Sequence, residues 1–212
     1  MPTQQPPAQI FVIPGINDDI LTFFRLSTWC IRKKFGRSHN LQAIFYPTGW
    51  LKEDAASIIN NIDTLCQRIT DQPPRTQVHL IGSSAGAVVA LLCAIQAPRA
   101  VTSVTVFSGW LKVTPALELL NNLPYTKIVK KFQKKYAGLN ANQKKALGKK
   151  TLLVQPKIDT VIPDEVRHLP YCQEVELPFI EHFGISNLGL LYSYIWPGNE
   201  KIIGHSIKKM VQ

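Results

Sequence analysis

Short apolar runs alternate along this chain with longer segments in which apolar residues recur every three or four positions. The runs have the length and composition of buried strands, and the longer segments have the periodicity of helices. The runs cover residues 9–13, 41–46, 78–82, 101–107, 151–154 and 174–177. Because strands that alternate with helices form βαβ crossovers, the pattern predicts an α/β fold with a doubly wound, mostly parallel six-stranded sheet and helices on both faces.

Length and composition predict one domain. The chain has 212 residues, of which 45% are hydrophobic and 18% charged, and it contains no internal repeat, so we expect a single domain over residues 1–212. Residues 1–7 lack the basic and apolar regions of a signal peptide, and no apolar run is long enough to span a membrane. Four cysteines without C-x-x-C spacing predict buried free thiols. These features favour a cytoplasmic protein.

The net charge of +10 is concentrated in residues 111–150. This segment carries ten lysines and one acid, Glu118, so its net charge is +9 and the rest of the chain sums to +1. Part of it has the pattern of a basic amphipathic helix, with five lysines opposite an apolar face. That face consists of Ile128, Val129, Phe132 and Tyr136. Because the charge is confined to one segment and no nucleic-acid-binding motif is visible, the sequence disfavours a nucleic-acid-binding protein.

The candidate chemistry begins at residues 78–86, which read VHLIGSSAG. A strand runs into a turn in which Gly82 and Gly86 bracket Ser84, and a helix-length apolar segment follows directly. A serine on such a sharp turn has a strained backbone, and side chains two residues away would collide with it, which explains the glycines. The spacing therefore predicts a nucleophile at Ser84 and not at Ser83. The alternative, a tight turn between a buried strand and a buried helix, stays open.

This arrangement resembles the α/β-hydrolase family, over about residues 9–190. In that family a nucleophile, an acid and a histidine follow one another along the chain at strand ends. The segment LLVQPKIDTVIP is similar to the family's acid-bearing strand and loop, which implies that Asp159 is the acid. The segment VELPFIEHFG resembles the last strand and the histidine loop, which implies that His182 is the base.

Other histidines are alternatives to His182. His205 follows a glycine, as the histidine of that family usually does, but no strand immediately precedes it. His79 falls within a strand, where a neutral, hydrogen-bonded core histidine is expected. We expect His168 on a surface helix and His39 in a polar turn.

Two carboxylates are alternatives to Asp159. Asp164 suits the cap of a helix better, and Glu181 a position facing solvent. The histidines and cysteines are scattered and have no metal-ligand spacing, so we expect neither a metal nor a cofactor.

The resemblance also implies an oxyanion hole made of two backbone N–H groups. One would be that of Ala85, directly after the nucleophile, and the other that of Ile16, just past Gly15. Trp50 and Trp110 both follow strand ends. Each either lines an apolar acyl pocket or packs at the edge of the core.

The lysine-rich segment lies where α/β-hydrolases commonly carry a cap over the active site, and we expect a cap or lid at about 111–150. Such a helix either packs its apolar face on the domain with its lysines in solvent, or presents the lysines to an anionic membrane or an anionic acyl carrier. In the second case the protein would be peripheral to a membrane.

Together these residues predict a serine hydrolase that cleaves a carboxylic ester or thioester. A serine hydroxyl is a poor nucleophile unless a histidine takes its proton, and the histidine needs a carboxylate to orient it. The expected substrate is a small-molecule or lipid-like acyl compound with an apolar acyl group. A non-catalytic hydrolase-like module that binds lipid or a partner, and an acyltransferase with the same triad, stay open as alternatives.

Overall fold

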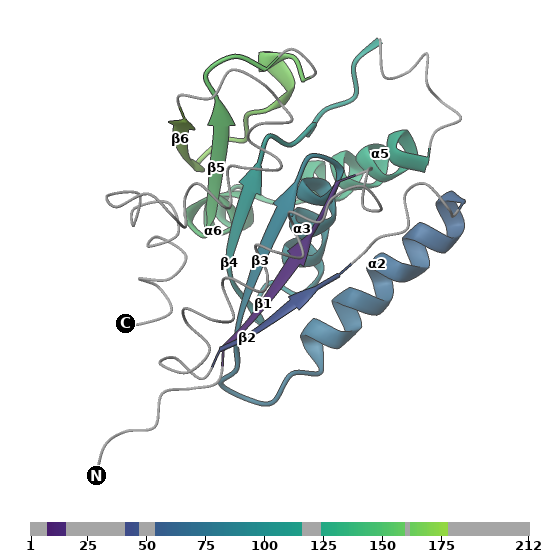
Figure 1. Cartoon of the computed structure of the whole chain (residues 1–212), viewed down its shortest axis with the longest axis vertical. Helices are drawn as coiled ribbons and strands as arrows, with labels where there is room; N and C mark the ends of the chain where they lie inside the picture. The colour runs from purple at the N-terminus through teal and green to yellow at the C-terminus, as the bar shows by residue number, and fades with distance from the viewer. Residues whose placement is uncertain (1–7, 16–40, 47–53, 116–123, 160–161, 178–212) are drawn as a thin grey trace.

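The computed structural model describes residues 8–15, 41–46, 54–115, 124–159 and 162–177, which form a layered α/β structure (Figure 1). The strands are β1 (Ala8–Ile13), β2 (Leu41–Phe45), β3 (Gln77–Ser83), β4 (Val101–Phe107), β5 (Thr151–Pro156) and β6 (Gln173–Leu177). The helices are α2 (Ala55–Thr70), α3 (Ala85–Gln96), α5 (Pro124–Ala137) and α6 (Ala141–Lys149), with a short 3₁₀ turn, η1 (Asp164–Val166). The predicted strands are confirmed to within two residues at each end.

The six strands form one sheet in the order β2-β1-β3-β4-β5-β6, and every neighbouring pair is parallel. The first strand along the chain, β1, therefore has β2 on one side, and strands β3 to β6 follow in order on the other side. In open parallel sheets such a reversal leaves a crevice beyond the carboxyl ends of the two central strands. Here those strands are β1 and β3, so a site is expected beside the residues that follow Ile13 and Ser83.

Helix α3 is the centre of the helical layer. It contacts β1, β3 and β4 on one side and α2 and α5 on the other. All residues from Ala85 to Ala94 are buried, which explains why this helix has no polar face. Its small residues, the alanines above all, let it approach the sheet closely.

Helices α2 and α5 are amphipathic, as their sequences predict. The Asp54 side chain caps α2 by accepting a hydrogen bond from the Ser57 backbone N–H at 2.8 Å. In α5, Ile128, Val129 and Phe132 are buried, which confirms the apolar face of the lysine-rich helix. Because α5 lies against α2 and α3, this helix belongs to the core of the domain. A cap formed by residues 111–150 stays a prediction, and residues 116–123 lie outside the described residues.

The described cysteines are free thiols. Cys66 of α2 and Cys93 of α3 are buried and face each other with their Sγ atoms 2.9 Å apart, and burial raises the pKa of the Cys93 thiol. Cys172 is half-buried, and Cys30 lies outside the described residues. None of the helices in the described ranges has the length and apolar character needed to span a membrane.

Candidate active site

Ser84 occupies a strained turn between β3 and α3. Its backbone angles are φ 51° and ψ −118°, outside the regions that residues with side chains normally adopt. Two hydrogen bonds hold the turn: the Ser84 N–H donates to the Phe107 carbonyl at 2.9 Å, and the Ala87 N–H donates to the Ser84 carbonyl at 3.1 Å. Ser84 is half-buried at the carboxyl end of the sheet, whereas its neighbour Ser83 is fully buried in β3.

The two glycines are required because backbone packs directly on backbone here. A Cβ atom at Gly82 would lie 2.4 Å from the Gly86 carbonyl oxygen. A Cβ atom at Gly86 would lie 2.2 Å from the Ile13 carbonyl oxygen and 2.5 Å from that of Pro14. The first turn of α3 is thus pressed against the end of β3 on one side and the end of β1 on the other. This is the steric reason expected from the sequence, with β1 as an additional participant.

The loop after β1 passes beside the Ser84 side chain. An ideal Cβ atom at Gly15 would lie 3.0 Å from Ser84 Cβ and 3.5 Å from Ser84 Oγ. The main chain therefore runs next to the hydroxyl where the second oxyanion donor is expected. That donor, Ile16, lies outside the described residues. Ala85 is the first residue of α3, so its N–H is one of the four that a helix leaves unused. The role of both groups stays a prediction.

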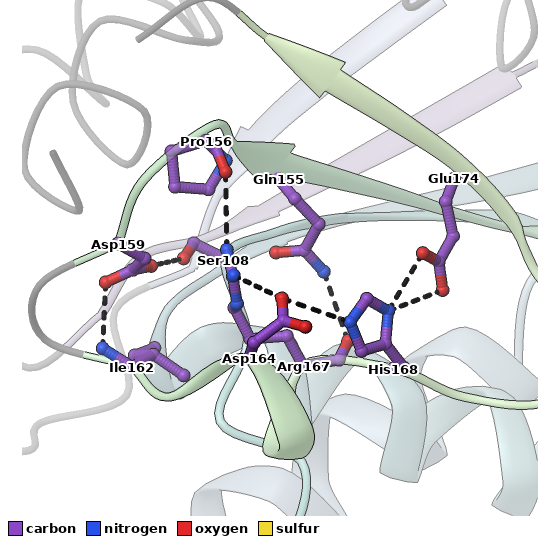
Figure 2. A network of polar contacts seen from close by, with 9 residues as sticks. All are labelled: Ser108, Gln155, Pro156, Asp159, Ile162, Asp164, Arg167, His168 and Glu174. Atoms are coloured by element: carbon purple, nitrogen blue, oxygen red, sulfur yellow. Dashed lines mark hydrogen bonds and ion pairs between the residues drawn. The ribbon is translucent and has the colours of Figure 1, made fainter. Parts of the chain in front are cut away.

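Asp159 lies in the loop after β5, and both of its carboxylate oxygens accept hydrogen bonds (Figure 2). Oδ1 accepts from the Ile162 backbone N–H at 2.8 Å, and Oδ2 accepts from the hydroxyl of Ser108. Ser108 directly follows β4 and is fully buried. Because the Ser84 N–H bonds to the residue just before Ser108, the predicted nucleophile and the predicted acid lie at the adjoining ends of β3, β4 and β5.

Ser108 is a site residue that the sequence did not predict. A serine and a glycine directly after a strand could have drawn attention to it, but nothing in the sequence reveals its partner 51 residues away. The predicted base, His182, and its alternative, His205, lie outside the described residues, as do Trp50, His39 and Glu181. The complete triad therefore stays a prediction.

His79 is a core histidine, as predicted. It is buried within β3, and its Nδ1 lies 2.7 Å from the hydroxyl oxygen of Ser103 on β4. Burial lowers the pKa of His79 to about 4, because the charged imidazolium would lose its hydration. The ring is therefore neutral near pH 7.

Arg167 makes hydrogen bonds to residues before and after Asp159 in the loop that carries this acid (Figure 2). Arg167 is buried, and its guanidinium donates to the carbonyl of Pro156 at 3.3 Å and to the carboxylate of Asp164. The Gln155 side chain in turn donates to the Arg167 carbonyl at 3.1 Å. The residues before and after Asp159 are thus joined through one cation.

Asp164 does not cap a helix, so that prediction was wrong. It is the first residue of η1 and follows Pro163, and its carboxylate pairs with Arg167 and with His168, whose Nε2 is 3.2 Å away. His168 lies two residues beyond the end of η1 and is not on a surface helix as expected. Glu174 of β6 lies 2.9 Å from its Nδ1, and this carboxylate, together with Asp164, raises the pKa of His168.

Trp110 is half-buried and packs against the core, and its backbone carbonyl accepts a hydrogen bond from the Tyr125 hydroxyl at 2.8 Å. This contact ties the segment after β4 to α5. A role in an acyl pocket stays a prediction. In the part of the chain that the structure describes, no group of three or more His, Cys, Asp and Glu residues could hold a metal ion.

Comparisons with known proteins agree with this architecture. Residues 61–161, nearly half of the chain, match the family model described as "Putative esterase". No curated protein matches the sequence. Among solved structures, Est1E from Butyrivibrio proteoclasticus has a TM-score of 0.66 at 12% identity, covering 99% of this chain and 90% of that chain.

Two further structures come from metagenomes. One, from a study of the lipolytic enzymes LipS and LipT, has a TM-score of 0.62 at 13% identity and covers 100% of this chain and 98% of that chain. The other is MGS-M2, an α/β hydrolase enzyme from a Medee basin deep-sea metagenome library, with a TM-score of 0.55 at 13% identity, covering 95% of this chain and 89% of that chain. At these identities the likeness establishes the fold.

We predict that Gly86→Ala strongly destabilises the protein. The added methyl group would lie 2.2 Å from a backbone oxygen, so the end of β1 or the start of α3 must move. We expect a loss of about 3 kcal/mol in the free energy of unfolding, measured by urea denaturation. The matched control is Gly138→Ala, where the nearest atom to the new methyl group would be 3.5 Å away. Equal stability of the two variants would contradict the packing described here.

We predict that His168 stabilises the protein only at lower pH. Its raised pKa means that the folded state binds the proton more tightly than the unfolded chain does. Its contribution should be complete below the unfolded pKa of about 6.5 and should disappear as the pH rises through the higher pKa of the folded state. Unfolding of the wild type and of His168→Gln, compared between about pH 5.5 and pH 8, measures this. A stability difference that does not shrink with rising pH would count against it.

Proposed function

We propose that this chain, which has the α/β-hydrolase fold, is a serine hydrolase that cleaves a carboxylic ester or thioester with Ser84 as nucleophile. The observation that carries the proposal is the strained turn of Ser84 at the switch point of the sheet, with the main chain of Gly15 beside its hydroxyl. The match to the esterase family model supports an ester as the bond broken, because the matched residues include both Ser84 and Asp159.

In the proposed reaction, Ser84 Oγ attacks the acyl carbonyl while His182 accepts the hydroxyl proton. Backbone N–H groups of Ala85 and Ile16 stabilise the oxyanion. His182 then gives the proton to the leaving alcohol or thiol, and Asp159 orients the imidazole and stabilises its charged form. In the second half, water attacks the acyl-enzyme and regenerates Ser84.

Neither histidine of the described ranges suits the role of the catalytic base. This supports assigning the base to a histidine outside those ranges. His79 is neutral but lies five residues before Ser84 inside β3, and its Nδ1 is engaged with Ser103. His168 lies between two carboxylates and is held away from the nucleophile's strand, at the edge of the sheet beside β6. The resemblance that points to His182 therefore has no rival among the histidines of the described ranges.

The proposed substrate has an apolar acyl group. Trp110, three residues beyond the end of β4, offers an apolar surface near the carboxyl ends of the strands. Two of the similar structures are reported as a lipolytic enzyme and as Est1E with ferulic acid bound, so apolar and aromatic acyl groups are the first to test.

We further propose that the outer face of α5 binds an anionic membrane. Its lysines 127, 130, 134 and 135 are exposed, and its apolar face is buried against α2 and α3 and so cannot enter lipid. No acidic residue occurs between Glu118 and Asp159. That stretch also has no arginine, the residue that recognises phosphate and nucleic acid by paired hydrogen bonds. Compact lysine charges without an apolar anchor suit diffuse attraction to anionic headgroups.

We predict that Ser84→Ala lowers kcat for p-nitrophenyl acyl esters by on the order of 10⁴- to 10⁶-fold and abolishes labelling by a fluorophosphonate probe. The control is Ser83→Ala, which removes the neighbouring hydroxyl, buried in β3, and should still be labelled. Equal labelling of wild type and Ser84→Ala would refute the assignment.

A chain-length series of esters and thioesters, assayed with and without an added alcohol, separates the related functions. Hydrolysis in water supports the proposal, preferential transfer to the alcohol indicates an acyltransferase, and inactivity on every ester and thioester indicates a non-catalytic module.

We predict that the protein co-sediments with vesicles that contain phosphatidylglycerol and not with neutral phosphatidylcholine vesicles. Lys127→Gln/Lys134→Gln/Lys135→Gln should weaken binding at least about tenfold, since each lysine near an anionic surface contributes about 1 kcal/mol. The control, Arg75→Gln/Arg99→Gln/Lys157→Gln, removes three exposed charges elsewhere. Equal weakening by both variants, or no binding to either vesicle, would contradict the proposal.

A further inference from the structure

Strand β4 ends in a buried serine with an unfavourable backbone conformation. Ser108 has no exposed surface and a φ of 44°, in the left-handed region where glycine is preferred. Such a conformation persists only where the surroundings fix it. The Ser108 N–H donates to the Val154 carbonyl at 3.0 Å, and a Cβ atom on the next residue, Gly109, would lie 2.7 Å from Ala87 Cβ. The end of β4 therefore packs between β5 and the first turn of α3.

The strained backbone directs the Ser108 hydroxyl toward the loop after β5. There it donates to Oδ2 of Asp159 (Figure 2). The other carboxylate oxygen is held by the Ile162 N–H, which belongs to the same loop. A loop donor alone would let the carboxylate move with its loop. Ser108 adds a donor from the rigid end of β4, so the carboxylate is fixed relative to the sheet.

The same strand end also holds the nucleophile. Phe107 accepts the hydrogen bond from the Ser84 N–H, and Ser108 is the next residue. The positions of Ser84 and of the Asp159 carboxylate are thus set by two consecutive residues of β4. An error of about 1 Å in such a constellation is costly for catalysis, so this connection has a functional consequence.

We propose that Ser108 is a positioning residue for the acid of the site: its hydroxyl fixes the Asp159 carboxylate against the end of β4 and favours its charged form. The proposal rests on the proposed function, in which Asp159 orients the catalytic histidine. Ser108 itself touches no reacting atom.

The test compares Ser108→Ala with Ser103→Ala. Ser108→Ala keeps a residue with a side chain at this positive φ and removes the hydroxyl that donates to Asp159. Ser103→Ala removes another buried hydroxyl from the same strand, one that bonds to His79 and not to the site. Ser108→Gly, which tolerates the positive φ, is the second variant if the alanine protein does not fold. Thermal unfolding is recorded for all of them.

We expect Ser108→Ala and Ser108→Gly to lower kcat by about 10- to 100-fold with little change in KM, because a charge-assisted hydrogen bond at the acid is lost. The acid limb of the kcat/KM profile should move to higher pH, because a carboxylate with one donor fewer holds the neighbouring imidazolium more tightly. Ser103→Ala should change neither quantity.

An unmoved acid limb and wild-type kcat in the Ser108 variants, in a protein whose wild type is active and whose Ser84→Ala variant is not, would overturn this proposal alone. A comparable loss in Ser103→Ala would do the same, because the effect would then be one of general stability. A wild type that neither turns over esters nor reacts with the fluorophosphonate probe would overturn the proposed function, and this proposal with it.

Discussion

The structure of this protein depends on one place where backbone meets backbone without room for a side chain. The first turn of α3 lies so close to the ends of β1 and β3 that a methyl group at Gly86 or Gly82 would come within 2.4 Å of a carbonyl oxygen. This contact forces Ser84 into its unusual conformation and brings the loop after β1 beside it. The same packing that closes the core therefore creates the half-buried turn that carries Ser84.

The sheet extends this constraint to the acid. Because β3, β4 and β5 are adjacent and parallel, their carboxyl ends meet at one edge, and residues distant in sequence come together there. The end of β4 contacts both the Ser84 turn and Asp159. Arg167 fixes the acid-bearing loop from its far side by joining Pro156 to Asp164. The candidate site is thus supported by hydrogen bonds on three consecutive strands.

The two faces of α5, within the lysine-rich segment, differ in chemistry. The inner face of α5 supplies Ile128, Val129 and Phe132 to the core, where burial of large apolar groups stabilises the fold. The outer face carries four exposed lysines, at positions 127, 130, 134 and 135. A helix already committed to the core can present charge at a fixed position, which is why we assign it a surface role and not insertion into lipid.

The six strands, the glycine-framed turn at Ser84 and the neutral core histidine could be predicted from the amino-acid sequence, because each follows from local periodicity or from sterics within a few residues. Resemblance to a known family singled out Asp159 but not what holds it. Only the tertiary structure revealed the Ser108 hydrogen bond and the pairing of Asp164 with Arg167 and His168, which corrected the predicted helix cap. The Asp164 pairs join residues three and four positions apart and depend on the backbone conformation of that short segment. The contact between Ser108 and Asp159 depends on which strand ends become neighbours, and this follows from the order of strands in the sheet, a property that no local pattern encodes.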